Sequence, residues 1–148
     1  MKELDMAYTN TKLVYEVLDA VEKATKKEEK IQILKQNDTW ALKDVLRATY
    51  DDAIQFLLPA GTPPYKPSKE GSIPSNLLKQ HKNLTYIVKG GQGEKMPGFK
   101  REKVFINMLE SVHPKEAELL LKMINKESLR KGITKKLVQE AFPGLISK

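Results

Sequence analysis

The chain has 148 residues, with 26 Lys and Arg against 19 Asp and Glu, a net charge of +7 and no cysteine. This length suffices for one domain with a hydrophobic core, and the lack of cysteine excludes disulfides, thiolate nucleophiles and cysteine-ligated zinc. No apolar run reaches the roughly 20 residues of a membrane span, and the first residues are too polar to begin a signal peptide. We therefore expect a cytoplasmic protein.

The positive charge lies in the second half of the chain. Residues 1–77 hold 11 Lys and Arg against 12 Asp and Glu, whereas residues 78–148 hold 15 against 7. Long-range attraction to a polyanion grows with the number of phosphates neutralised. The asymmetry therefore favours nucleic acid over a small acidic molecule as the partner.

Hydrophobic periodicity predicts helices along the first third of the chain. Residues 1–9 are expected to form a flexible start, and Thr9, Asn10 or Thr11 is expected to cap a first helix that ends near residue 24. A charged turn at residues 23–30 opens a second helix. A third is predicted from Trp40 into residues 54–58, with the Trp40 ring packed on the core rather than stacked on a base.

The middle of the chain is dominated by loops. Residues 59–74 hold five prolines and two glycines, which predicts a loop draped over the core. Ser75 is expected to cap a helix that continues to Val88, although residues 84–88 alone would suit a strand. The glycines of residues 89–95 lack the Gly-Lys-Ser/Thr pattern of a phosphate loop, and they are expected to form a simple connection.

The last third predicts three helices, at residues 99–112, from Pro114 to about 124 and at residues 135–142. The apolar face of the second of these ends at Ile124, and Gly132 can adopt the positive φ that follows a helix. Thr134 is a suitable N-cap for the last one. The whole pattern predicts an all-α, compact multi-helix bundle over residues 10–146.

A basic turn joins the last two predicted helices. Five cations lie close together there, with Glu127 as their one acidic neighbour: Lys126, Arg130, Lys131, Lys135 and Lys136. Phosphate is the natural partner of such a surface, which also includes the turn at Gly132 and Thr134. The alternative is an ordinary solvated helix end. Three further cations begin the helix at residues 99–112 and could extend the surface: Lys100, Arg101 and Lys103.

Two patches of the sequence resemble a known family. Leu129-Arg-x-Gly132-Ile-x-x-Lys136-x-Val138-x-x-Ala141-Phe142-Pro is similar to the end of the N-terminal DNA-binding domain of ATP-dependent DNA ligases, and Pro143-Gly-Leu-Ile146 is most similar to the tailed-phage enzymes. The second patch is Leu42-Lys43-x-Val45-x-x-x-Thr49-Tyr50-x-x-x-x-Gln55-Phe56. The resemblance implies an all-helical domain that grips duplex DNA through the minor groove and flanking phosphates.

The motifs of catalysis are absent from the sequence. ATP-dependent ligases form a lysyl adenylate within a Lys-x-Asp-Gly motif, and this chain contains no Asp-Gly. It also lacks a nucleophile elbow and a His-Glu-x-x-His helix. His81 and His113 have no carboxylates at a metal-binding spacing. The expected protein is thus a stand-alone binding module without the adenylation domain, with no catalytic residues, cofactor or metal.

Two functions fit these features. The first is a phage-encoded protein that binds double-stranded DNA, nicked or intact, with little sequence preference in the infected host cell. The second is an interaction protein that kept the fold and binds a phage or host replication, transcription or virion component. Asp51 and Asp52 in the second patch favour the latter, since acidic residues repel phosphate. The tail from Gln139 to Ile146 also echoes sliding-clamp peptides, although Phe142 and Leu145 are expected to pack on the core.

Overall fold

Residues 11–147 are described by the computed structural model, and they form seven α-helices and one 3-10 helix without a strand. The helices, in chain order, are α2 (Val14–Lys23), α3 (Lys27–Gln36), α4 (Trp40–Tyr50), α5 (Leu77–Gln80), η1 (His81–Tyr86), α6 (Gly98–Ser111), α7 (Pro114–Ile124) and α8 (Lys135–Ala141). The predicted all-α bundle is confirmed. The predicted flexible start and the caps Thr9 and Asn10 lie outside the described residues.

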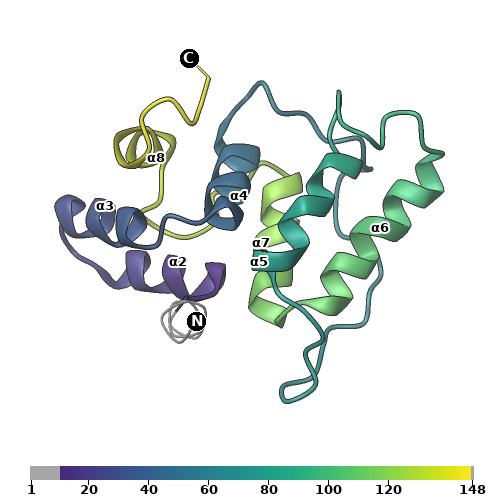
Figure 1. Ribbon diagram of the computed structural model, residues 1–148, viewed down its shortest axis with the longest axis horizontal. Helices are drawn as coiled ribbons and strands as arrows, with labels where there is room; N and C mark the ends of the chain where they lie inside the picture. Colours follow the sequence, from purple (N-terminus) through teal and green to yellow (C-terminus); the bar gives the residue numbers. More distant parts are fainter. Residues whose placement is uncertain (1–10, 148) are drawn as a thin grey trace, which may run out of the picture.

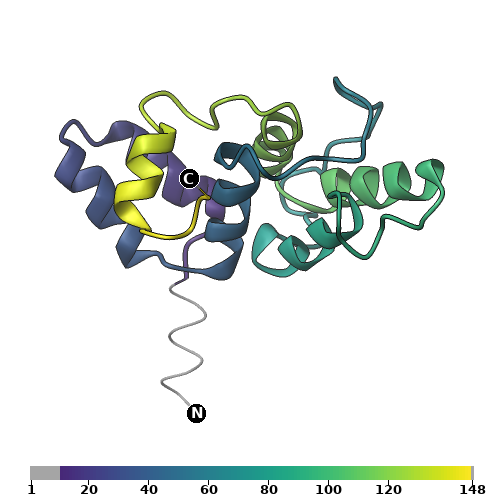
Figure 2. The ribbon, with the colours of Figure 1, turned by 90° about the horizontal axis from the view of Figure 1, so that it is seen from above.

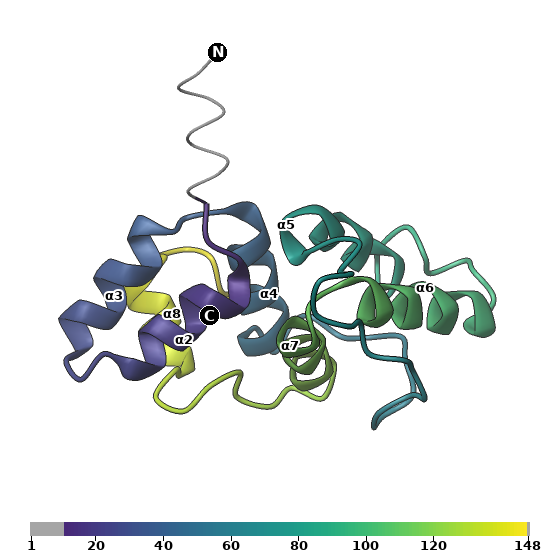
Figure 3. The ribbon, with the colours of Figure 1, turned by 90° about the horizontal axis from the view of Figure 1, so that it is seen from below.

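Two central helices, α4 and α7, separate two groups of elements. The three views agree that α2, α3 and α8 lie on one side, and that α5 and α6 lie on the other (Figures 1, 2 and 3). One hydrophobic core runs through the centre, where Leu18, Leu46 and Leu120 are fully buried. As a result, α6 and α8 stand at opposite ends of the molecule.

Helix ends follow the sequence signals closely. The Thr39 hydroxyl accepts a hydrogen bond from Leu42 N at 3.1 Å, and the Thr134 hydroxyl accepts one from Leu137 N at 3.2 Å. His113 Nδ1 accepts from Lys115 N at the start of α7, with Pro114 as the first helical residue. Each of these side chains satisfies an N–H that has no partner within its helix.

Two predicted helices end early. The Asp51 carboxylate accepts a hydrogen bond from Ala53 N at 2.9 Å, a local bond that competes with continued helix, so α4 stops at Tyr50. The predicted extension to residue 58 is therefore wrong. The predicted helix to Val88 is also too long, and it begins after Asn76 rather than Ser75. Phe56 and Val88 instead form an isolated antiparallel bridge.

Trp40 is the clearest error among the predicted core residues. Its side chain is 69% exposed, and the Lys43 ammonium lies 4.1 Å from the ring centroid. The ring therefore forms a cation–π contact on the surface. Trp40 is the first residue of α4, and the spacing of apolar residues in the sequence did not show whether its side chain points toward the core or toward solvent.

The proline-rich segment of residues 59–74 lies over the core as predicted. Gly61 N donates to Asn125 Oδ1 at 3.0 Å, Lys66 N donates to Glu110 Oε2 at 2.7 Å, and the Ser68 hydroxyl donates to Glu110 O. These bonds fasten the loop to α6 and to the end of α7. They satisfy backbone groups that prolines prevent from joining a helix or sheet.

A buried carboxylate joins the two sides of the molecule. Glu116 in the first turn of α7 is fully buried, and its Oε1 accepts a hydrogen bond from Leu77 N, the first residue of α5, at 3.1 Å. Burial raises the pKa of Glu116 to about 6, against the opposing effect of the N–H groups of Leu77 and of nearby Tyr15 and Val14 in α2. One side chain thus faces the starts of α2 and α5.

Glu116 predicts a stability change with pH. Its pKa rises from 4.5 to about 6 on folding, so the folded state keeps a proton that the unfolded state loses within this window. Stability should fall by roughly 2 kcal/mol as the pH rises through the window, and level off above it. Glu116→Gln cannot titrate. The free energy of unfolding in urea, measured across this window, should fall in the parent and not in Glu116→Gln, apart from changes that both proteins share. Identical pH profiles for the two proteins would contradict the assignment.

Candidate nucleic-acid interface

The segment between α7 and α8 has the conformation that its glycine predicts. Gly132 has φ +83°, and Thr134 caps α8 directly after it. Lys126 also has a positive φ, of 55°, where α7 gives way to the segment. The chain therefore turns twice within residues 126–132, and its backbone lies on the surface beside α3.

Tyr50 holds this segment against the end of α4. Its hydroxyl accepts a hydrogen bond from Leu129 N at 3.1 Å and donates one to Ile133 O at 2.9 Å. These bonds bring together the two sequence patches that resemble the ligase domain. Leu129 and Ile133 are themselves buried, so the segment is an integral part of the packed structure.

Two of the predicted DNA-binding cations contact the protein itself. Lys126 Nζ donates to Ala48 O at 2.6 Å and to Asp51 O at 2.9 Å, at the end of α4. Burial lowers the pKa of Lys126, against the opposing effect of Asp51 and Asp52. A cation at this place satisfies carbonyls that have no partner within the helix, so Lys126 has a structural role.

Arg130 also contacts other parts of the protein. Its side chain is only 11% exposed, and its Nε lies 3.1 Å from Asp19 Oδ1 of α2. Its Nη1 donates to Leu129 O. The guanidinium therefore ties the segment to α2, and its position is not that of a free phosphate ligand.

The other cations of the basic turn face outward. Lys135 forms an ion pair with Asp52 at 3.2 Å, in which the Asp52 side chain is 91% exposed, so water screens the pair strongly. Lys131 and Lys136 are exposed, and neither has an acidic partner within the described residues. Of the five cations that the sequence groups together, these two are the most available to a ligand.

The starts of α3 and α8 enclose a hollow that sequence reasoning missed. Its volume is about 340 Å³, and five of its lining residues define what we call the basic hollow: Lys27, Lys30, Gly132, Thr134 and Lys136. A Cβ on Gly132 would lie 2.4 Å from the Lys30 ammonium, so a glycine at this position leaves room for the lysine side chain. Lys27 pairs with Glu140 at 2.6 Å, whereas Lys30 has no acidic partner in residues 11–147.

The cations of α6 do not join this surface. The Arg101 guanidinium donates to the carbonyls of Leu57, Gly93 and Met96, which fastens the glycine-rich connection to α6. Lys100 and Lys103 are exposed. They belong to the first two turns of α6, however, and this helix lies at the far end of the molecule from α8 (Figure 2).

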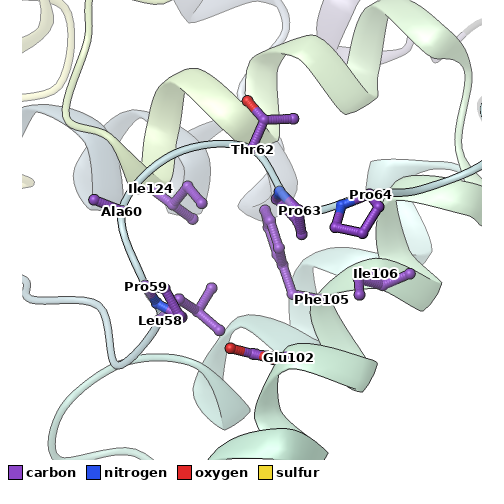
Figure 4. A pocket seen from close by; sticks show the side chains of 10 residues that line it. All are labelled: Leu58, Pro59, Ala60, Thr62, Pro63, Pro64, Glu102, Phe105, Ile106 and Ile124. Carbon is purple, nitrogen blue, oxygen red and sulfur yellow. The ribbon is translucent and has the colours of Figure 1, made fainter.

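Another hollow has the wrong chemistry for phosphate. The proline-rich loop covers an apolar pocket of about 340 Å³ between α6 and the end of α7, where Phe105, Ile106 and Ile124 face prolines of the loop (Figure 4). Glu102 is the one charged residue among its lining side chains. A carboxylate beside apolar walls repels phosphate, so this pocket lies outside the candidate interface.

Of the features that favoured a protein partner, Asp51 and the C-terminal tail are packed into the fold, whereas Asp52 is exposed and pairs with Lys135. Asp51 is 1% exposed, and its Oδ2 accepts a hydrogen bond from Ser147 N at 3.0 Å. Burial alone would raise its pKa, but the N–H groups of Ser147 and Ala53, with Arg47, lower it overall. Phe142 and Ile146 are buried as well. The tail thus packs on the core, and Asp51 does not lie on a surface.

The residues described hold no arrangement of three or more His, Asp or Glu side chains suited to a metal ion. None of the helices in this part of the chain is long and apolar enough to cross a membrane.

Arg130 allows a test of the structural assignment. Arg130→Ala leaves the Asp19 carboxylate with only its longer contact to the Lys115 ammonium, at 3.7 Å, and removes the tie between the segment and α2. We expect the free energy of unfolding to fall by about 2 kcal/mol. Lys131→Ala is the matched control, because it removes an exposed neighbouring cation and should change stability by less than about 0.5 kcal/mol. Urea denaturation measures both. Equal effects of the two variants would show that Arg130 is an ordinary surface cation.

Comparison with known families gives one match. The model of DUF6433, a family of unknown function, matches residues 17–131. The match begins within α2, includes α3 through α7 and Lys131, and stops before Gly132 and α8. No curated protein matches the chain. Since the family model covers most of the sequence, the chain belongs to DUF6433.

Proposed function

We propose that this protein binds duplex DNA without making or breaking bonds in it, through backbone phosphates and the adjoining minor groove and with little sequence preference. The observation that carries the proposal is the convergence of Lys30 of α3 and Lys136 of α8 on the hollow at Gly132, with the exposed Lys131 next to Gly132 in the chain. Sequence-distant cations on one exposed surface suit a polyanion, because each phosphate contact releases condensed counterions.

The resemblance to the ligase DNA-binding domain points the same way. Its two patches lie far apart in the sequence, and Tyr50 joins them through hydrogen bonds to Leu129 and Ile133, on either side of Gly132. A family likeness concentrated at one place in the fold is more informative than one spread over unrelated helices. A phage origin and action in the host cell remain part of this proposal.

The second candidate is a protein-binding role, and the exposed aromatic side chains favour it. Trp40 and Phe99 are each 69% exposed, and large aromatic side chains are common anchors of protein interfaces. Trp40 is the first residue of α4 and Phe99 is the second residue of α6, and neither lines the basic hollow. A protein partner of this kind would leave the basic hollow free, so the two functions can be tested separately.

The salt dependence of duplex binding tests the first candidate. In a fluorescence anisotropy titration, the logarithm of affinity should fall linearly with the logarithm of salt, and Lys30→Gln/Lys131→Gln/Lys136→Gln should reduce the slope by roughly 2 to 3. The control Lys95→Gln/Lys100→Gln/Lys103→Gln removes the same charge near the start of α6 and should keep the parent slope.

Two results would contradict the proposal. No duplex binding at low salt would exclude a DNA-binding role for this surface. Equal loss in the two triple variants would show that net charge, rather than the basic hollow, sets the affinity. In that case, capture of a nuclease-resistant protein partner through Trp40 or Phe99 becomes the better explanation.

A further inference from the structure

A third hollow lies between α4 and η1, and its lining differs from those of the basic hollow and the apolar pocket. Its volume is about 500 Å³, and Ala48, Ile54, Leu84 and Val88 give it an apolar floor. We call it the α4–η1 groove. A concave site of this size is typical of small-molecule sites that combine apolar walls with a few polar groups.

Three cations from three separate elements surround this floor. Arg47 belongs to α4, Lys82 belongs to η1, and Lys89 follows the Phe56–Val88 bridge. The Arg47 side chain is 53% exposed, and Asp51, its nearest acidic partner, is 4.0 Å away, beyond hydrogen-bonding distance. Neither lysine has an acidic partner in the described chain. The groove thus offers three cationic donors with unused hydrogen-bonding capacity.

A fixed histidine completes the groove. His81 Nδ1 lies 2.6 Å from Asp44 Oδ2, and the imidazole is 13% exposed. An ionised carboxylate only accepts hydrogen bonds, so Nδ1 carries the proton of this bond. His81 lines the groove, and its Nε2 makes no hydrogen bond to the rest of residues 11–147. The Asp44 contact therefore sets the ring orientation and leaves one nitrogen for a ligand.

We propose that the α4–η1 groove binds an organic phosphate with a flat apolar body, in the size range of a nucleoside monophosphate. The phosphate would lie among Arg47, Lys82 and Lys89, since a guanidinium and two ammonium groups match its oxygens. The ring would lie on the aliphatic floor, and His81 Nε2 would hydrogen-bond a hydroxyl or ring nitrogen. Both a free nucleotide and the phosphorylated end of a DNA strand carry this chemistry.

This site is independent of the duplex surface. The basic hollow is built by α3 and α8, whereas the groove is built by α4, η1 and the residues after it. Either site can therefore be correct if the other is not. The groove also differs from the apolar pocket in Figure 4, where no cation lines the walls.

Calorimetric titration with a ligand series tests the proposal. Adenosine 5′-monophosphate should bind, and inorganic phosphate and adenosine should each bind at least roughly tenfold more weakly, because each supplies half of the contacts. Arg47→Gln and Lys82→Gln should each weaken the nucleotide by roughly tenfold. Lys35→Gln, a charge-matched change of an exposed lysine of α3 that lines neither the groove nor the basic hollow, should leave its affinity unchanged. Circular dichroism of each variant checks that the fold is kept.

A 5′-phosphorylated single-stranded oligonucleotide distinguishes the two sources of the ligand. If it competes with the mononucleotide, the groove receives strand ends; if it does not, the groove takes free nucleotides, and both results support the site. Three results would overturn it: no binding of mononucleotide or oligonucleotide at millimolar concentration, equal affinity for the nucleotide and adenosine, or equal weakening by Lys35→Gln and Arg47→Gln.

Discussion

The ion pair between Arg130 and Asp19 helps to determine where the basic hollow lies. Its 3.1 Å contact joins the α7–α8 segment to α2, and Lys126 fastens the same segment to the end of α4. With both ends held, α8 is brought against α3, where the two helices pack together. Lysines of α3 and α8 then line the hollow at Gly132, so internal ion pairing contributes to the candidate binding surface.

The same use of buried charge recurs at the centre of the fold. Glu116 faces the starts of α2 and α5 from α7, and Asp51 binds both the turn after α4 and the C-terminal tail. Charged groups with several backbone partners impose one geometry, because any other arrangement leaves them unsatisfied in a dry environment. The packed helices can consequently present surface lysines in fixed positions.

Local signals predicted most of the helices, and they predicted Thr134 as the cap of α8, because a cap acts on N–H groups within three residues of itself. Long-range partners were beyond such reasoning. Arg130 reads as a free cation in the sequence, and its carboxylate partner lies 111 residues away. Lys30 was assigned to a charged helix start for the same reason, since its place beside Gly132 depends on tertiary packing. The Trp40 error came from treating a large aromatic residue as a core residue by default.

The central claim is that duplex DNA contacts the meeting point of α3 and α8. Titration of isotope-labelled protein with a short duplex, followed by backbone amide NMR, maps the contact surface without altering any residue. The account predicts that the largest shifts fall on the residues around Lys30, Lys131 and Gly132, while the first turn of α6 stays unchanged. Shifts confined to the starts of α4 and α6, or no shifts at low salt, would contradict it.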